Sequence, residues 1–254
     1  MSDKISALLI SFNEEKNIER FLKEASYYAD EIIIVDSFSD DNTEILAKKN
    51  PKVKFIKKEF NNFTEQRNFA LSIANNDWIT FFDADESISQ ALLDEIIETI
   101  KKPTFDAYYV YRKFYFKNKH IKHTGMNHDK AVRLFRKSKV QYDENLLVHE
   151  TVNYDGSIGT LKNKLNHYTF NNEQEYLDKL NHYSRLRAEE LYIKKLKPNF
   201  FHYVIKPAFK FFKFYFINLG FLDGKEGFVI SKIHATSIFN RYKYLDEIYR
   251  KEKR

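Results

Sequence analysis

Residues 5–35 read ISALLISFNEEKNIERFLKEASYYADEIIIV, and this stretch contains the repeating unit of the fold. Ile5–Ile10 is a short apolar run typical of a buried strand, and Glu31–Val35 is a second one that is rich in β-branched residues. Between them, apolar residues from Ile18 to Ala25 recur at the spacing of one helix face. A strand, a helix and a second strand in this order predict two parallel strands with a helix packed on them.

The same alternation continues as far as residue 82. Thr43–Lys49 and Thr64–Ala74 have the pattern of helices, while Val53–Ile56 and Trp78–Phe82 have the pattern of strands. Strands that alternate with helices at this spacing form a mostly parallel sheet with helices on both faces. The first third of the chain is therefore predicted to have an α/β fold.

The composition excludes several classes of protein and of site. The chain has 254 residues, 43% of them hydrophobic, with only 6 Gly and 4 Pro, so it is neither disordered nor fibrous. The absence of Cys excludes a disulfide scaffold, a Cys-ligated zinc site and a Cys nucleophile. Because no apolar region with a cleavage site follows Met1, we expect no signal peptide and a cytoplasmic protein.

The positive charge is concentrated at the end of the chain. Of 42 basic and 36 acidic residues, residues 199–254 hold 11 of the basic and 5 of the acidic ones, which accounts for the whole excess of +6. A basic segment of this kind suggests a nucleic-acid or a membrane partner. An ordinary solvated helix face is the third alternative.

Polar side chains follow three of the predicted strands, where the ligand crevice of a parallel sheet lies. They are Ser11, Asn13 and Glu14 after the first strand, Asp36 and Asp40 after the second, and Asp83 and Asp85 after the fourth. Carboxylates at one sheet edge repel each other unless a cation or a donor-rich ligand lies between them. Asp83 and Asp85 are two residues apart, so their side chains share one side of an extended chain and suit Mg²⁺ or Mn²⁺ that carries phosphate oxygens. The alternative is that these loop carboxylates only cap helices.

Glycine-rich phosphate loops are missing from the sequence. Neither G-x-G-x-x-G nor G-x-x-x-x-G-K-[ST] occurs. This absence disfavours both Rossmann dinucleotide chemistry and P-loop chemistry. If a nucleotide binds, we therefore expect a metal ion to neutralise its phosphates in place of backbone amides.

Four motifs, in this order, resemble the family 2 glycosyltransferases, which have the GT-A fold. They are LISFNEE at 9–15, IVDSFSDDNT at 34–43, QRNFA at 66–70 and FDADE at 82–86. Four further motifs resemble those of the bacterial lipopolysaccharide core β-1,4-glucosyltransferases, and with them the resemblance covers nearly the whole chain. They are RLFR at 133–136, VHE at 148–150, NHY at 166–168 and GFLDG at 220–224. Phe38 replaces a Gly of the pattern, which could change its loop without removing a ligand.

The resemblance implies a Rossmann-like GT-A sheet, mostly parallel and covered by helices on both faces. We expect a nucleotide-sugar-binding half at 1–115, an acceptor-binding half at 116–198 and a basic, aromatic, amphipathic helical extension at 199–254. The implied reaction is an inverting transfer of a hexose, glucose from UDP-glucose, to a lipopolysaccharide core or a related glycolipid.

The resemblance also assigns roles to the residues that match its motifs. Those that would contact the nucleotide sugar are Ser11, Asn13, Glu14, Asp36, Arg67 and Asp83. Asp36 would accept a hydrogen bond from the base, and Asp83 and Asp85 would bind Mg²⁺ or Mn²⁺. Such an ion polarises the diphosphate and stabilises the charge that develops as it leaves.

An inverting transfer needs one general base that deprotonates the acceptor hydroxyl. We expect this base to be Glu150, because the apolar residues before it would desolvate its carboxylate and keep it basic. The alternative is that Glu150 is a surface strand residue. Arg133 and Arg136 are spaced for one face of a strand or loop and are candidates for binding phosphate or an acidic sugar.

The sequence leaves the roles of several histidines undecided. His149 and His167 could each complete the metal shell, hold a phosphate or be structural. His120, His123 and His128 lack the spacing of zinc ligands. We expect the stretch that contains them, residues 117–130, to shape the acceptor pocket.

Residues 199–222 include 10 aromatic residues, three Lys and no acid. Lys206, Lys210 and Lys213 fall on one narrow stripe of a helix, and a broad apolar face lies beside it. The large residues of that face are Ile205, Phe209, Phe212 and Phe216. The lysines interrupt the apolar run that a membrane span requires.

The segment can therefore pack as part of the core or lie in the membrane interface, with its lysines at anionic headgroups and its aromatic rings among acyl chains. We expect the interfacial arrangement, on the inner face of the cytoplasmic membrane. No nucleic-acid partner is expected, because the stripe is narrow and has no reading motif beside it.

Two other functions are weighed against glycosyl transfer. Phe81–Asp85 resembles the nucleophile motif of haloacid-dehalogenase-type phosphatases, with Asp83 and Asp85 as its carboxylates. That family has the motif on its first strand, whereas here it follows the fourth. A membrane-associated binding protein without turnover is the other alternative, and Asp83, Asp85 and Glu150 argue against it.

Overall fold

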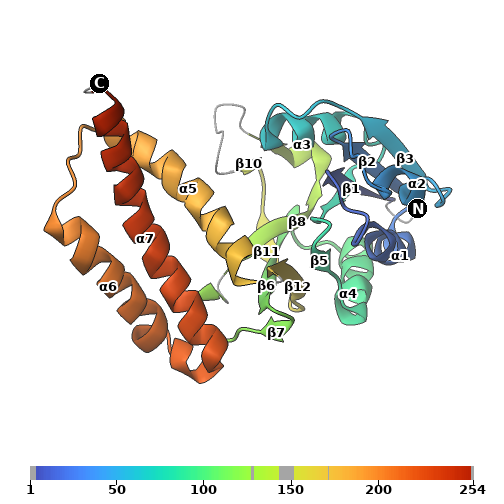
Figure 1. Ribbon diagram of the computed structural model, residues 1–254. Coiled ribbons are helices and arrows are strands. Elements are labelled where there is room, and N and C mark those ends of the chain that lie inside the picture. Colours follow the sequence, from blue (N-terminus) through green and yellow to red (C-terminus); the bar gives the residue numbers. More distant parts are fainter. Residues whose placement is uncertain (1–3, 127–128, 143–151, 171, 253–254) are drawn as a thin grey trace. The chain divides into compact units, whose positions relative to one another are not determined.

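The structure is a computed structural model, and it describes residues 4–126, 129–142, 152–170 and 172–252 (Figure 1). Contacts divide the chain into two compact units. The first consists of residues 1–112 and 129–167, and the second of residues 113–128 and 168–254. The functional segments at 1–115, 116–198 and 199–254 are defined by role, which this division does not test, so they remain a prediction.

A mostly parallel sheet forms the first unit. Its main strands are β1 (Ile5–Ser11), β2 (Glu31–Asp36), β3 (Val53–Lys57), β4 (Trp78–Phe81), β6 (Ala107–Phe116) and β8 (Lys130–Arg136). They are arranged in the order β3-β2-β1-β4-β8-β6. The first four strands pair in parallel, as the sequence predicts, whereas β8 is antiparallel to both β4 and β6.

Shorter strands complete this part of the chain. β5 (Glu86–Ser87) is antiparallel to β12 (Leu165–Phe170), and β11 (Ile158–Thr160) is parallel to β6. β9 (Val140–Tyr142) and β10 (Val152–Tyr154) form a separate antiparallel pair. The pairing of β5 with β12 places His167 opposite Glu86, next to the predicted metal site.

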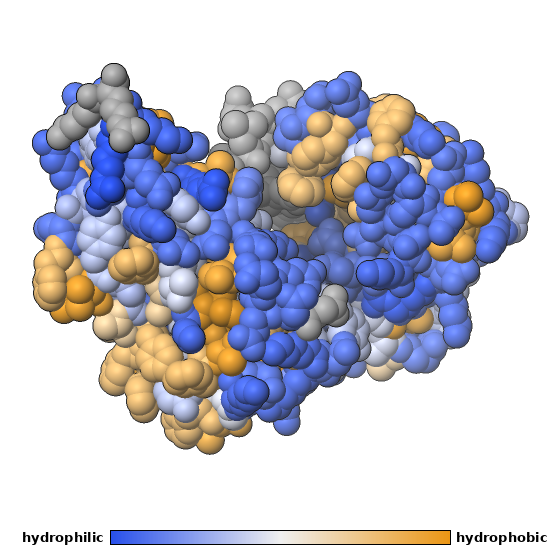
Figure 2. Space-filling model, in the orientation of Figure 1, coloured by the Kyte–Doolittle hydropathy of each residue, from blue (hydrophilic) through white to orange (hydrophobic). Residues whose placement is uncertain are grey.

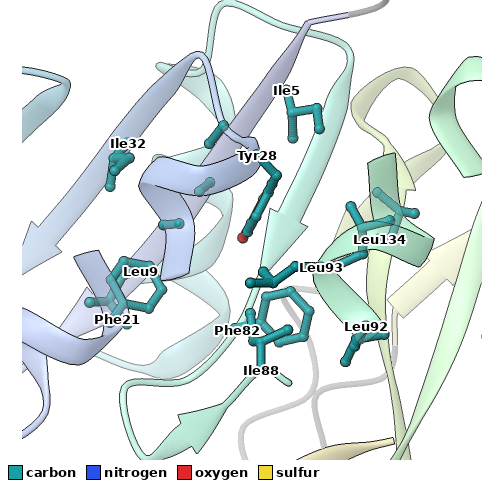
Figure 3. Packing of buried hydrophobic residues seen from close by; sticks show 14 of the residues in the cluster. Ile5, Leu9, Phe21, Tyr28, Ile32, Phe82, Ile88, Leu92, Leu93 and Leu134 are labelled. Atoms are coloured by element: carbon teal, nitrogen blue, oxygen red, sulfur yellow. The ribbon is translucent and has the colours of Figure 1, made fainter. Parts of the chain in front are cut away.

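Helices cover both faces of the sheet, which confirms the predicted α/β architecture. The four helices are α1 (Ile18–Tyr28), α2 (Thr43–Ala47), α3 (Phe63–Ser72) and α4 (Gln90–Lys101). Side chains alternate along each strand, so Leu9 packs with α1, α2 and α4 on one face, while Leu8 packs with α3 on the other. Figure 3 shows the first of these cores, in which Phe21 of α1 lies beside Leu9, and Leu93 of α4 lies near Phe82.

Three long helical segments dominate the second unit. They are α5 (Glu173–Ile193), α6 (Lys206–Phe212) with a π-helical turn on each side of it (Phe201–Ile205 and Lys213–Ile217), and α7 (Lys225–Glu252). α7 packs against both α5 and α6 (Figure 1). β7 (Lys119–His120) pairs with the end of β6. The predicted helical extension is therefore present.

None of the helices in the described part of the chain is long and apolar enough to cross a membrane. The lysine stripe predicted for the extension is divided between two environments. Lys206 Nζ donates a hydrogen bond to Tyr242 Oη of α7 at 2.9 Å, and Lys210 Nζ lies 4.3 Å from the centroid of the Phe214 ring. Of the three lysines, Lys213 is exposed, whereas Lys206 and Lys210 are half-buried. The three lysines therefore lie in different surroundings, because α7 covers part of the stripe. Their predicted contact with lipid headgroups stays a prediction.

Candidate active site

Asp36 joins the loops that follow β1 and β2. Ser11 Oγ donates to Asp36 Oδ2 at 2.7 Å. Ser39 donates its backbone N–H to Asp36 Oδ1 at 2.8 Å and its hydroxyl to Oδ2 at 2.6 Å. Asp36 is completely buried, and its hydrogen bonds to Ser11 and Ser39 hold these two loops together. Its predicted hydrogen bond to a nucleotide base stays a prediction.

Asn13 and Glu14 form the rest of this edge. Asn13 has a φ of +55°, a left-handed conformation that Asn adopts more readily than most residues, and its side-chain oxygen accepts from the Asp40 N–H at 3.0 Å. Glu14 accepts from Asn17 Nδ2 at 2.8 Å, and burial raises the pKa of its carboxyl. Thus Ser11, Asn13 and Glu14 lie together where the carboxyl ends of the first strands meet, as the sequence predicts.

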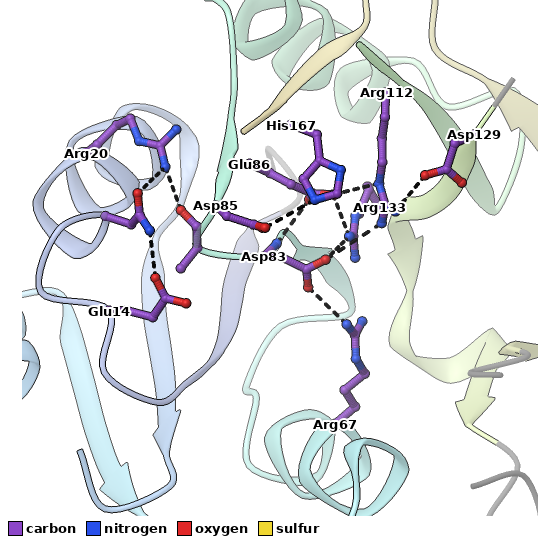
Figure 4. A network of polar contacts seen from close by, with 12 residues as sticks. Glu14, Arg20, Arg67, Asp83, Asp85, Glu86, Arg112, Asp129, Arg133 and His167 are labelled. Atoms are coloured by element: carbon purple, nitrogen blue, oxygen red, sulfur yellow. Dashed lines mark hydrogen bonds and ion pairs between the residues drawn. The ribbon is translucent and has the colours of Figure 1, made fainter. Parts of the chain in front are cut away.

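Three arginines surround the carboxylate of Asp83 (Figure 4). Arg67 Nη2 lies 3.0 Å from Asp83 Oδ1, Arg133 contacts Oδ2 directly, and Arg112 Nη2 lies 3.7 Å from Oδ2. Loss of solvent contact by itself raises the pKa of Asp83, but the charges of Arg133, Arg67 and Arg112 outweigh that effect and hold the pKa well below its ordinary value. Asp83 is therefore a firmly ion-paired carboxylate at neutral pH.

Glu86 holds the same arginines from the other side. Its Oε1 lies 2.7 Å from Arg133 Nη2 and 2.8 Å from Arg112 Nε, and its Oε2 accepts the backbone N–H of Asp83 at 3.0 Å. The Glu86 side chain is completely buried. Sequence reasoning gave no role to Glu86 or to Arg112, although Glu86 ends the FDADE motif and Arg112 is a charged residue inside an apolar strand.

Asp85 faces a histidine instead of arginines. His167 Nε2 lies 3.2 Å from Asp85 Oδ2, and the Asp85 side chain is 33% exposed. Arg20 of α1 donates to the carbonyl oxygen of Ala84 at 2.6 Å and so fixes the chain between Asp83 and Asp85. The Asp85–His167 pair presents one oxygen and one nitrogen, both of which are common metal ligands.

The spacing of this pair fits two neighbouring ligands of one ion. With metal–ligand distances of about 2.1 Å, ligands at right angles lie about 3 Å apart. No group of three or more His, Asp or Glu side chains that could hold a metal occurs in the described residues. An ion at Asp85 and His167 would therefore take its other ligands from phosphate oxygens or water, as Mg²⁺ commonly does.

Arg133 and Arg136 do not act as a pair. Arg133 is 2% exposed and also donates to the carbonyl oxygen of Phe81 at 2.8 Å, so it supports the site from inside. Arg136 Nη1 lies 3.1 Å from Asp77 Oδ2, and its guanidinium stacks over Trp78 at the other end of β4. The prediction that the two arginines share one face is wrong, because residues three apart in a strand point to opposite faces.

Two predicted residues cannot be placed. His149 and Glu150, the expected general base, lie outside the residues that the structure describes. Their roles stay predictions.

A family model and several known proteins are similar to this chain. A family model described as "Glycosyl transferase family 2" matches residues 6–169. An uncharacterised glycosyltransferase of Rickettsia bellii is 31% identical to the chain and covers 98% of it and 88% of the relative. The lipopolysaccharide core biosynthesis glycosyltransferase LpsC of Rhizobium meliloti is 27% identical, over 94% of this chain and 93% of LpsC.

Among solved structures, residues 1–349 of S. aureus TarS superpose with a TM-score of 0.50 at 18% identity. The match covers 98% of this chain and 92% of the TarS chain. This similarity concerns the fold, which is of the GT-A type in both chains.

Replacement of Glu86 by Gln should destabilise the protein strongly. Without the charge of Glu86, the guanidinium groups of Arg112 and Arg133 each lose one ion-pair partner. Breaking a buried ion pair costs about 3–5 kcal/mol of stability. The free energy of unfolding in urea measures the effect. Glu98→Gln is the matched control, because its side chain is 72% exposed and its pair with Lys101 contributes less than about 1 kcal/mol. Equal stability of the two variants would contradict the role of Glu86.

Proposed function

The chain belongs to glycosyl transferase family 2, and from that membership we propose that it transfers a hexose, with inversion, from a nucleotide diphosphate sugar to a glycolipid. The observation that carries the proposal is the Asp85–His167 pair at the sheet edge, in the same unit as the loop of Ser11, Asn13 and Glu14. TarS has been crystallised with UDP, which supports a UDP-linked donor such as UDP-glucose. The name of LpsC supports an acceptor of the lipopolysaccharide-core type.

We assign the metal site to Asp85 and His167. Their facing atoms are an oxygen and a nitrogen 3.2 Å apart, and Asp85 is partly open to solvent. An imidazole ligand suits Mn²⁺ better than Mg²⁺, which prefers oxygen ligands. When bound, the ion would neutralise the diphosphate and stabilise it as a leaving group. His167 must present an unprotonated Nε2 to take part.

Asp83 has a different task in this proposal. Both of its oxygens contact arginines, so we assign it to positioning and, through its 31% exposed side chain, to contact with the ribose. Arg67 extends from α3 to Asp83 and stacks over Phe81, which holds this side of the site in place. The sequence predicts Asp83 as a metal ligand together with Asp85. In this proposal His167 takes that role instead.

The proposed general base remains Glu150. It would take the proton of the acceptor hydroxyl as that oxygen attacks the anomeric carbon from the face opposite the diphosphate. A lipid-linked acceptor would place this reaction at a membrane surface. We propose the inner face of the cytoplasmic membrane, with the protein bound peripherally.

The phosphatase alternative fits the site poorly. A phosphatase of that type needs Asp83 as a nucleophile with an oxygen free to attack, whereas here Arg67 and Arg133 contact its two oxygens. A binding protein without turnover is distinguished by the absence of any release of nucleoside diphosphate.

Asp85→Asn and His167→Ala should each lower the Mn²⁺-dependent release of UDP from UDP-glucose. We expect a loss of about 100-fold or more for Asp85→Asn, because the charge that develops on the diphosphate loses its stabilisation. The assay uses a membrane lipid extract as the source of acceptor. Arg136→Gln is the matched control, since Arg136 lies at the other end of β4, and it should keep nearly full activity. Undiminished turnover in Asp85→Asn would rule out this metal assignment.

Glu150→Gln should separate donor binding from transfer. The variant should be stabilised by UDP and Mn²⁺ in a thermal-shift measurement as strongly as the wild type, because a ligand stabilises the folded state by mass action. Transfer to the acceptor should fall by about 100-fold or more, since general-base catalysis contributes about 10²–10⁴-fold. A wild-type rate of transfer would move the base to another residue.

A further inference from the structure

The second unit exposes many large apolar side chains between residues 200 and 228. Each of the following is at least 44% exposed: Phe200, Phe201, Val204, Ile205, Phe209, Phe212, Phe216, Ile217, Leu219, Phe221, Leu222 and Phe228. We call this set the apolar strip. Figure 2 shows apolar surface gathered over α6 and the turn that follows it. Monomeric soluble proteins rarely expose apolar residues so densely unless the surface binds something.

The exposed charged side chains of the apolar strip are positive. From residue 199 to residue 228, Lys213 and Lys225 are exposed. Of the two acids, Asp223 is 5% exposed, and Glu226 is paired with Lys119 Nζ at 2.6 Å. The surface therefore combines aromatic and aliphatic side chains with positive charge. This combination is complementary to an anionic lipid surface, whereas two copies of the strip would bring like charges together.

We propose that the apolar strip inserts into the lipid interface and that its phenylalanines, not its lysines, hold the protein there. This inference depends on the proposed function in one respect: a lipid-linked acceptor is the reason for the protein to bind a membrane. Full burial of one Phe side chain contributes more binding free energy than one Lys near an anionic surface does. Lys206 and Lys210 contribute less still, because they lie against Tyr242 and Phe214. Binding is therefore dominated by insertion and depends little on salt.

The turn at the end of the strip is held rigidly. The Asp223 carboxylate accepts the backbone N–H of Lys122 at 3.0 Å and that of His123 at 2.8 Å. Asn218 exchanges hydrogen bonds with the backbone of Thr124 in both directions, at 3.0 and 3.2 Å. The GFLDG motif thus attaches the loop around residues 119–125 to the strip. Once the strip is inserted, this loop, which we expect at the acceptor pocket, lies at the level of the lipid headgroups.

Glycines make this turn possible. A Cβ on Gly220 would lie 2.6 Å from the carbonyl oxygen of Phe214, and one on Gly227 would lie 1.8 Å from the carbonyl oxygen of Gly220. Leu219 itself has a φ of +57°. The close backbone approach keeps Leu219, Phe221 and Leu222 exposed at the end of the strip.

Co-sedimentation of the full chain with vesicles tests the proposal. The vesicles contain phosphatidylglycerol and phosphatidylethanolamine, and the salt concentration is either low or high. We expect the wild type to bind in both, with less than a threefold loss at high salt. The triple variant Phe209→Ser, Phe212→Ser, Phe216→Ser should bind at least tenfold more weakly. The matched control replaces three exposed apolar residues of the first unit, Ile45, Phe60 and Phe63, by Ser and should bind like the wild type.

Circular dichroism and donor-induced thermal shifts establish that each variant is folded. Three results would overturn the proposal: no binding by the wild type, loss of its binding at high salt, or retained binding by the triple phenylalanine variant. A dimer in solution that this variant abolishes, without vesicle binding by the wild type, would assign the strip to a second copy of the chain instead. Vesicle binding without any glycosyl transfer would leave this inference standing and remove the proposed function.

Discussion

The structure of the site depends on one cluster of buried ion pairs. Its members are Asp83, Glu86, Arg67, Arg112 and Arg133. Charged groups removed from water are tolerated only when they are well paired, so each member requires the others. The arginines come from α3, β6 and β8, and the carboxylates from the chain that follows β4. The antiparallel addition of β8 and β6 to the parallel strands therefore brings two of the three arginines, Arg133 and Arg112, to the FDADE motif.

This cluster also separates the tasks of two carboxylates that are two residues apart. Arginines neutralise Asp83 and keep its pKa low, which fixes it as a charged positioning group. Asp85 lies outside the cluster, is one-third exposed and faces an imidazole. One carboxylate of the motif thus holds the loop, and the other is available to a ligand. Environment, not residue type, makes the difference, as in other sites where two acids have different functions.

The sequence predicts the elements from residue 5 to residue 82 well, because apolar periodicity is a local signal. It also predicts that Ser11, Asn13, Glu14 and Asp85 lie at one edge of the sheet, because the carboxyl ends of parallel strands meet there. It does not predict Arg112 or Glu86, because their pairing joins residues far apart in the chain without a local pattern. The contact of His167 with Asp85 spans 82 residues. For a similar reason, the helical pattern predicts the lysine stripe but not the part of it that α7 covers.

We propose that Asp85 and His167, and not Asp83, bind the metal ion. Mn²⁺ titration in the presence of UDP, followed by calorimetry or by the electron paramagnetic resonance of free Mn²⁺, tests it most directly. We predict that Asp85→Asn and His167→Ala each weaken Mn²⁺ binding by about tenfold or more. The Asp83→Asn variant, if folded, should bind Mn²⁺ with an affinity within about threefold of that of the wild type. The reason is that the two carboxylate oxygens of Asp83 contact arginines and not the ion. Loss of Mn²⁺ binding in Asp83→Asn together with normal binding in Asp85→Asn would contradict this metal assignment.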